Sequence, residues 1–195
     1  MHERLVFLLE EPSMKWLLSG LLPRLFPGWI ERQHFLLVPH EGKSDLDRSI
    51  ARKLKAWQIP EDRFVILRDN DNVDCVDLKA RFVELCKQCG RPDTLVRLVC
   101  QELESWYLGD LLALSNAFQD PKLNSTPLQK RFIQPDVWQK PAVEVARLIP
   151  SFQKGMGAKK RGLSLSLSTN RSASYQAFVS GLQKVTGLQA ASSSH

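Results

Sequence analysis

The feature that most constrains the fold of this chain is the alternation, over residues 1–120, of short apolar runs with longer stretches of helical periodicity. The apolar runs are rich in Val, Leu, Ile and Phe, which is typical of buried strands. We expect strands at 4–9, 34–38, 64–67 and 94–100, and helices at 13–26, 44–57, 76–88 and 106–118. Strands that alternate with helices over short connections predict an α/β fold, with a mainly parallel sheet and helices on both faces.

The pattern weakens after Asp120. Four prolines interrupt residues 121–141, which we expect to be irregular. Helical patterns return at 142–149 and 172–187, and a Gly-rich basic loop, GMGAKKRG, lies between them. We therefore predict a core of residues 1–120, with a basic, mostly helical C-terminal extension of residues 121–195 packed on it.

Net positive charge is concentrated in the last 56 residues, 140–195, because acidic residues are scarce there. Of the 27 Lys and Arg residues, eight lie beyond residue 139, together with only one of the 21 acidic residues, Glu144. The body of the chain is nearly neutral, so the net charge of +6 belongs to the last part. A basic segment beside a carboxylate-bearing body indicates a polyanionic partner such as nucleic acid; a solubilising basic tail is the alternative.

Two further observations bear on location and on the cysteines. No apolar run reaches the ~18 residues needed to cross a membrane, and the N-terminal run is too short and too acidic for a signal peptide. We therefore expect a cytoplasmic protein with no membrane partner, whose four cysteines are reduced thiols. Cys86 and Cys89 form a CxxC, but no second pair or nearby histidines complete a zinc site, which favours structural thiols.

Acidic residues follow three of the four predicted strands. Ligands of an open parallel sheet bind outside the carboxyl ends of its strands, so these side chains are expected at one edge. The residues are Glu10 and Glu11 after the first strand, Asp69 and Asp71 after the third, and Glu102 and Glu104 after the fourth. Converging carboxylates repel one another unless a cation lies between them, and Mg²⁺ prefers such oxygen ligands. The alternative for Asp69 and Asp71 alone is an ordinary Asx-rich turn.

The segments that contain these acidic residues resemble those of a known domain family. FLLEEPSMKWLL, VILRDND and CQELESWYL are similar to segments of the topoisomerase–primase (Toprim) domain. The chain resembles more closely the compact Toprim-like proteins of unknown function that are related to overcoming-lysogenization-defect (OLD) nucleases. The segments HEGKSDLDRSI, SFQKGMGA and NRSASYQAF extend this resemblance over nearly the whole chain. Toprim domains usually have Gly after the first Glu, whereas this chain has Glu11-Pro12, which leaves Glu11 as an alternative to Glu10.

The resemblance implies Mg²⁺-dependent phosphodiester hydrolysis on DNA or RNA, with Mn²⁺ as a substitute for Mg²⁺. Four residues match the acids of the family: Glu10, Asp69, Asp71 and Glu104. The resemblance implies that they are both metal ligands and catalytic groups. It also implies a phage-defence effector that works with an ABC-type ATPase. We expect basic residues to hold the nucleic-acid backbone, and the candidates are Lys43, Lys159, Lys160, Arg161 and Arg171. The alternative function is a non-catalytic nucleic-acid-binding or regulatory subunit that keeps the Toprim scaffold.

The loop HEGKS, residues 40–44, resembles the end of a phosphate-binding P-loop. Leu37 takes the place of the first glycine of that motif and lies inside a predicted strand, which argues against ATP hydrolysis. We expect Lys43 to face phosphate and Ser44 to cap the following helix. His40, Glu41 and Asp45 either join the metal site or belong to a solvated polar loop.

Overall fold

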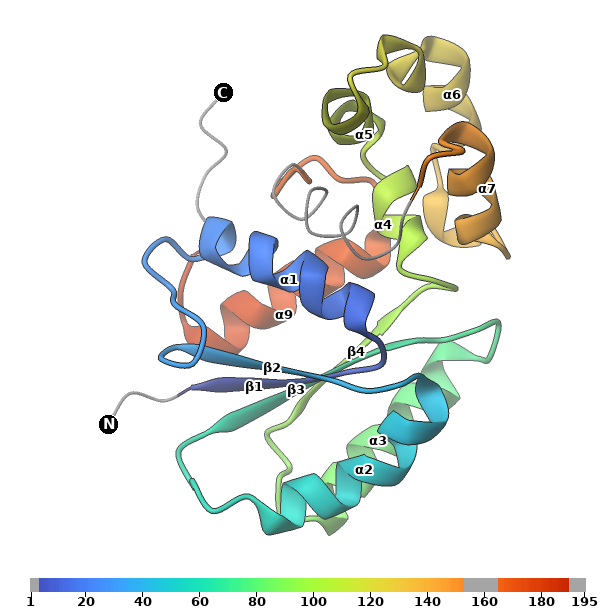
Figure 1. The fold of residues 1–195 in the computed structure, drawn as a ribbon. Helices are drawn as coiled ribbons and strands as arrows, with labels where there is room; N and C mark the ends of the chain where they lie inside the picture. The colour runs from blue at the N-terminus through green and yellow to red at the C-terminus, as the bar shows by residue number, and fades with distance from the viewer. Residues whose placement is uncertain (1–3, 153–164, 190–195) are drawn as a thin grey trace.

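The described part of the chain folds around a four-stranded sheet in which every neighbouring pair of strands is parallel. The structure, a computed structural model, describes residues 4–152 and 165–189 (Figure 1). The strands stand in the order β2-β1-β3-β4 and are β1 (Leu5–Leu9), β2 (Phe35–Pro39), β3 (Arg63–Asp69) and β4 (Leu95–Val99). The predicted α/β fold with a parallel sheet is confirmed. Because β2 and β3 lie on opposite sides of β1, the strand order reverses between β1 and β3, which marks the ligand-binding crevice of such sheets.

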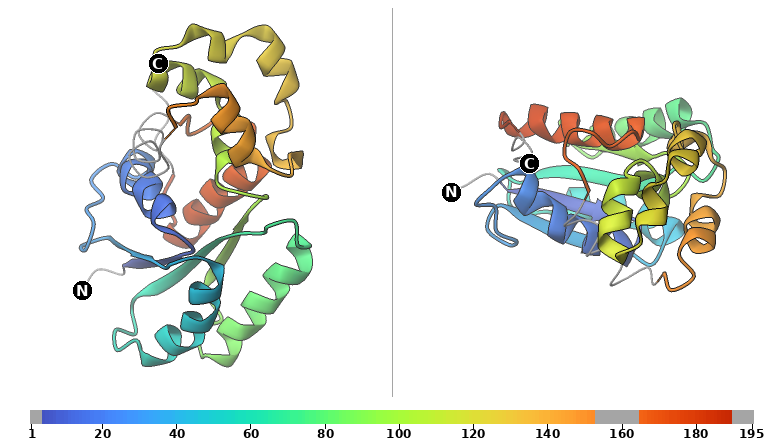
Figure 2. Two further views of the ribbon diagram at one scale, coloured as in Figure 1. Left: turned by 45° about the vertical axis from the view of Figure 1, so that its right-hand side comes forward. Right: turned by 90° about the horizontal axis from the view of Figure 1, so that it is seen from above.

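Helices cover both faces of the sheet (Figures 1 and 2). On one face, Phe7 and Val65 pack in a core with α1 (Pro12–Leu25) and α9 (Ala173–Thr186). On the other face, residues such as Val6 and Ile66 pack against α2 (Lys43–Ala56) and α3 (Cys75–Gln88). All five residues of β1 are buried, since alternate side chains serve the two cores. This explains why the strand reads as a continuous apolar run.

A group of short helices lies on the α1 and α9 side of the sheet, following β4 (Figure 1). Its members are α4 (Glu104–Leu108), α5 (Leu111–Phe118), η1 (Pro121–Asn124), α6 (Thr126–Arg131), η2 (Pro135–Val137) and α7 (Pro141–Leu148). The prediction of one helix over 106–118 is wrong, because the chain breaks at Gly109 and Asp110 begins a new helix as its N-cap. The stretch 121–141, predicted irregular, instead holds one α-helix and two 3₁₀ turns, each with Pro in its first turn.

The segment that leads into α9 is attached closely to α4. The buried Asn170 donates from Nδ2 to the carbonyl oxygen of Trp106 at 2.8 Å and accepts the N–H of Ser172 at 2.9 Å. A Cβ at Gly109 would meet the backbone nitrogen of Ser172 at 2.9 Å, so only glycine allows this approach. α9 packs in the same hydrophobic core as α1. The predicted boundary between a core of residues 1–120 and an extension of residues 121–195 stays a prediction.

Candidate functional site

The structure brings the four predicted acids to the carboxyl edge of the sheet. Glu10 follows β1 directly, Asp69 is the last residue of β3, Asp71 lies in the next turn, and Glu104 begins α4. Glu10, Asp69 and Glu104 are buried, at 8 %, 7 % and 3 % exposure, although carboxylates are almost never buried without a partner. The four acids, called the acidic cluster below, therefore lie at one edge of the sheet, with Glu10 and Asp69 at the switch point between β1 and β3.

Glu10 is fixed at this crevice by backbone hydrogen bonds. Its N–H donates to the carbonyl oxygen of Leu67 at 3.2 Å, and its own carbonyl oxygen accepts the N–H of Gly42 at 2.9 Å. Its carboxylate Oε2 accepts the backbone N–H of Asp69 at 3.0 Å. Burial raises the pKa of Glu10 to about 7, against the lowering effect of the hydrogen bond from Asp69. Glu10 thus changes protonation near neutral pH.

Asp69 is the most unusual acid of the cluster. Its Oδ1 is buried and accepts no hydrogen bond from the described part of the chain. Burial raises the pKa of Asp69 well above its ordinary value, and the nearby charges of Glu10, Glu11 and Glu104 raise it further. A buried carboxylate oxygen without a partner is energetically costly, so this position calls for a proton or a cation.

Asp71 is the exposed member and has a basic partner. Lys43, the first residue of α2, places Nζ 3.1 Å from Oδ2 of Asp71. Both side chains are partly open to solvent, so this ion pair contributes little stability. It does bring one predicted nucleic-acid-binding lysine to the acidic edge. The predicted capping role of Ser44 is wrong, because α2 begins at Lys43 and its N-cap is Gly42, at φ 102°.

Two amide side chains that the sequence analysis missed join the loops that carry the acids. Asn70 Oδ1 accepts the backbone N–H of Gln101, and Gln101 Oε1 accepts the N–H of Asn72 at 3.0 Å. Asp71, Asn72 and Gln101 all have positive φ, at 49°, 64° and 64°, which costs free energy in residues other than glycine. We call the two hydrogen bonds made by the side chains of Asn70 and Gln101 the amide clasp. It ties the turn after β3 to the turn after β4, and only the Asn-Asp turn composition hinted at it in the sequence.

The structure distinguishes Glu10 from Glu11. Glu11 is the N-cap residue of α1, and its carboxylate accepts the hydroxyl of Ser13. Glu10 instead bonds the backbone of Asp69 at the switch point. The geometry therefore favours Glu10 as the first acid of the cluster.

Two of the remaining loop candidates, His40 and Asp45, have hydrogen-bond partners away from the acidic cluster. Ring nitrogen Nδ1 of His40 lies 2.8 Å from the carbonyl oxygen of Leu9, and Nε2 lies 2.6 Å from Oγ of Ser49. With both nitrogens occupied, the buried His40 braces the end of β1 rather than offering a metal ligand. Asp45 accepts the backbone N–H of Glu41 at 3.1 Å, which orders the start of α2.

Of the predicted basic residues beyond Lys43, the structure describes only Arg171. Lys159, Lys160 and Arg161 lie outside the described residues. Arg171 is exposed and donates from Nη1 to the carbonyl oxygen of Gln129 at 3.0 Å, in a cavity beside α5. Arg171 therefore lines a cavity that is separate from the acidic cluster.

The acids are neighbours without forming a ready coordination shell. In residues 4–152 and 165–189, no three His, Cys, Asp or Glu side chains are grouped closely enough to hold a metal ion. The chemistry of the donors still fits Mg²⁺, since all four are carboxylates and Asp69 has a buried oxygen that accepts no hydrogen bond from these residues. The CxxC is separate from this site: Cys86 is buried in the core on the α3 face, and burial raises its pKa to about 11, as for a structural thiol.

Fold and site together define a class: a parallel α/β protein with buried carboxylates at the switch point of its sheet. Residues 9–183 match a family described as "Domain of unknown function (DUF4276)". The chain belongs to this family.

No curated protein matches the sequence of this chain. Among solved structures, it is similar to the C-terminal region of the Xanthomonas campestris pv. campestris OLD protein. The identity is 17 %, the match covers 96 % of this chain and 98 % of that chain, and the TM-score is 0.48. No helix among the described residues has the length and apolar character needed to cross a membrane.

Proposed function

We propose that this protein is a Mg²⁺-dependent nuclease of the Toprim type that hydrolyses phosphodiester bonds in DNA or RNA. The observation that carries the proposal is Asp69, a buried carboxylate with an oxygen that accepts no hydrogen bond from the described chain. The charges of Glu10, Glu104 and Asp71 are near enough to raise its pKa. A divalent cation offsets this concentration of negative charge. The likeness of the three acidic motifs to Toprim domains supports the same reading.

The chain supplies the groups that such a reaction needs. Asp69, Asp71 and Glu104 would hold Mg²⁺ or Mn²⁺, which stabilises charge on the scissile phosphate and lowers the pKa of water. Glu10, whose pKa is about 7, is suited either to hold metal or to accept and return a proton at neutral pH. Lys43 beside Asp71 adds a positive charge to attract a phosphate to the same edge.

The biological setting follows from the resemblance seen in the sequence. It supports a cytoplasmic phage-defence effector that acts with an ABC-type ATPase on nucleic acid. A second function, a non-catalytic binding or regulatory subunit, is favoured by one observation. In the described residues, no three metal-ligand side chains are already grouped. The two functions differ in whether the cluster takes up a divalent cation.

Calorimetric titration with Mn²⁺ and Mg²⁺ tests the proposal without a guess about the substrate. We expect the wild-type protein to bind Mn²⁺, and the Asp69→Ala/Asp71→Ala variant to bind none, because two ligands from one strand end are lost. A wild type that binds no Mn²⁺ at millimolar concentration, even with an oligonucleotide added, would favour the non-catalytic function. Positive binding justifies screening single- and double-stranded DNA and RNA for cleavage.

The amide clasp gives a more specific prediction. We expect Gln101→Ala and Gln101→Gly each to weaken Mn²⁺ binding by about tenfold, the usual scale for groups that orient metal ligands. Both remove the bond from Oε1 to the N–H of Asn72. Gln101→Gly should be more stable than Gln101→Ala by roughly 1 kcal/mol, because glycine accepts a φ of 64° without strain.

Calorimetry and urea denaturation of the two Gln101 variants separate the two effects. If Mn²⁺ affinity follows stability, so that only the alanine variant binds weakly, the clasp supports folding and does not position the acids.

A further inference from the structure

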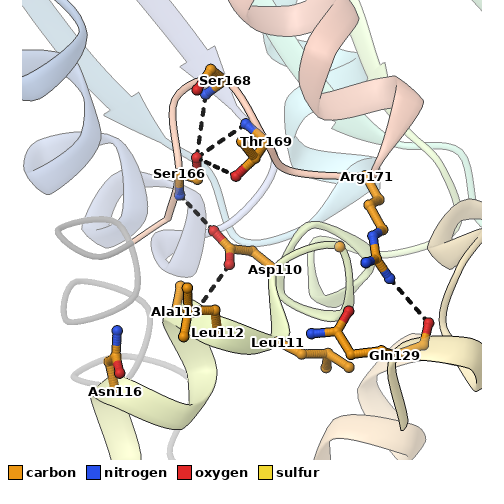
Figure 3. Close-up of a pocket in the computed structure, with 11 residues that line it drawn as sticks. Asp110, Leu111, Leu112, Ala113, Asn116, Gln129, Ser166, Ser168, Thr169 and Arg171 are labelled. Atoms are coloured by element: carbon orange, nitrogen blue, oxygen red, sulfur yellow. Dashed lines mark hydrogen bonds between the residues drawn. The ribbon is translucent and has the colours of Figure 1, made fainter. Parts of the chain in front are cut away.

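A polar cavity, separate from the acidic cluster, lies between α5, α6 and the chain segment before α9 (Figure 3). Its volume is about 310 Å³, at the lower end of the range for small-ligand pockets. None of the four acids of the candidate site lines it. The polar residues that line it include Asp110, Asn116, Gln129, Ser166, Thr169 and Arg171. The cavity is therefore a separate place for one small group rather than an extension of the acidic cluster.

The walls of the cavity are held in place by Asp110. Its Oδ1 accepts the N–H of Ala113 at 3.0 Å, and its Oδ2 accepts the N–H of Ser166 at 2.6 Å (Figure 3). The first bond caps α5, and the second fixes the segment before α9 against that helix. Because both oxygens are already engaged with backbone donors, Asp110 acts as a brace for the cavity and is not its recognition group.

Arg171 supplies the recognition group on one side. Its backbone N–H donates to the carbonyl oxygen of Gly109 at 2.9 Å, and its Nη1 donates to that of Gln129 at 3.0 Å. Among the described residues it forms no ion pair, and a guanidinium carries five N–H donors. Two anchors thus fix an exposed guanidinium at the cavity, with N–H donors left that can form two parallel hydrogen bonds to an anion such as phosphate.

The other side of the cavity offers different chemistry. Asn116 presents an exposed amide, and Figure 3 places it across the cavity from Arg171. Leu112, on the same helix, is 55 % exposed and adds apolar surface. An amide pairs with the edge of a nucleobase, and an apolar side chain packs against its face. A cavity that suits a phosphate at one side and a base at the other suits a nucleotide.

We propose that this cavity binds a single unpaired nucleotide of the nucleic-acid substrate, with its phosphate at Arg171 and its base at Leu112 and Asn116. The inference rests on the proposed nuclease function and adds its substrate class. A cavity of about 310 Å³ has no room for a base pair, so the substrate is a single strand or the unpaired end of a duplex.

Binding of labelled oligonucleotides in EDTA, followed by fluorescence anisotropy, tests this inference without cleavage. We expect the wild type to bind a short single strand more tightly than the blunt duplex of the same sequence. Arg171→Ala should weaken single-strand binding by about tenfold or more, the scale of a charge-assisted hydrogen bond to phosphate. Arg171→Lys should fall between the two, since it keeps the charge and loses the planar fork.

Matched variants separate recognition from general charge and from folding. Arg52→Ala removes the same charge from an exposed site on α2 and should leave single-strand binding nearly unchanged. Asn116→Ala keeps both anchors of Arg171 and should still weaken binding severalfold. Thermal unfolding of each variant identifies any loss that comes from misfolding.

Three results would overturn the inference. They are absence of single-strand binding by the wild type, equal binding of the blunt duplex, and an equal effect of Arg52→Ala and Arg171→Ala. The proposed nuclease function fails separately, through the absence of Mn²⁺ binding. Asp69→Asn distinguishes the two, because it should lose Mn²⁺ binding and keep single-strand binding in EDTA.

Discussion

Asp69→Asn is expected to make the protein more stable and to remove its metal binding. The wild-type carboxylate is buried, and its Oδ1 accepts no hydrogen bond from the described residues. At pH 8 the folded state either buries this charge or holds a proton that the unfolded state has released. The neutral amide avoids both costs, and we expect a gain of about 1 kcal/mol in the free energy of unfolding without metal. The same change should remove Mn²⁺ binding. Any nuclease activity should fall about 10³-fold, as for the loss of several kcal/mol of charge stabilisation.

Urea denaturation in EDTA, calorimetry with Mn²⁺ and cleavage assays measure the three effects. Asp93→Asn is the matched control, because Asp93 is exposed and precedes β4, at the opposite edge of the sheet. It should change none of them. A destabilised Asp69→Asn protein that still binds Mn²⁺ would show that Asp69 is a structural residue and that the metal binds elsewhere.

The stability of the metal-free protein is expected to fall as the pH rises from about 4.5 to 7. The pKa of Glu10 is about 7 in the folded protein, against 4.5 for an ordinary Glu. In this window the folded state therefore holds a proton that the unfolded state has released, so raising the pH favours unfolding. A difference of this size corresponds to about 3 kcal/mol, and the raised pKa of Asp69 acts in the same direction.

Denaturation curves at a series of pH values in EDTA measure this loss. Glu10→Gln should remove the part that Glu10 causes, whereas Glu61→Gln, at an exposed loop position, should leave the pH profile unchanged. Added Mg²⁺ should restore stability at pH 8 and have little effect at pH 5, since protons and the metal compete for the same carboxylates. Stability that rises with pH in EDTA would contradict the assignment of buried, repelling acids.

The sheet and the position of its acids were predictable because each depends on local pattern. Continuous apolar runs such as Leu5–Leu9 belong to strands buried on both faces, and parallel strands present their carboxyl ends at one edge. This is why Glu10, Asp69 and Glu104, far apart in sequence, were expected together. The break at Gly109 was missed, although Gly-Asp is a reasonable end and start for two helices, because apolar periodicity continues across it.

The amide clasp and the cavity beside α5 could not be predicted from local pattern. The positive φ values of Asn72 and Gln101 result from how two turns, about 30 residues apart, meet at the sheet edge. The cavity likewise depends on Gly109 and Asn170 bringing the segment before α9 against α5. Tertiary contacts of this kind leave no periodic signal, so only the assembled chain shows them.

The strand order also determines which parts of the acidic cluster are dynamically secure. β1 and β3 are the inner strands, flanked on both sides by other strands, so their amide hydrogens exchange with solvent only through large-scale opening. Glu10 and Asp69 stand at the ends of these two strands, whereas Glu104 follows the edge strand β4. Asp69 lies beyond Leu67, the last residue of β3 that pairs with β1, and pairs with Val99 of β4. Fraying of β4 would therefore expose Asp69 and release Glu104, while the backbone hydrogen bonds of Glu10 to Leu67 and Gly42 stay in place. Local unfolding can thus open one side of the acidic cluster and leave Glu10 fixed.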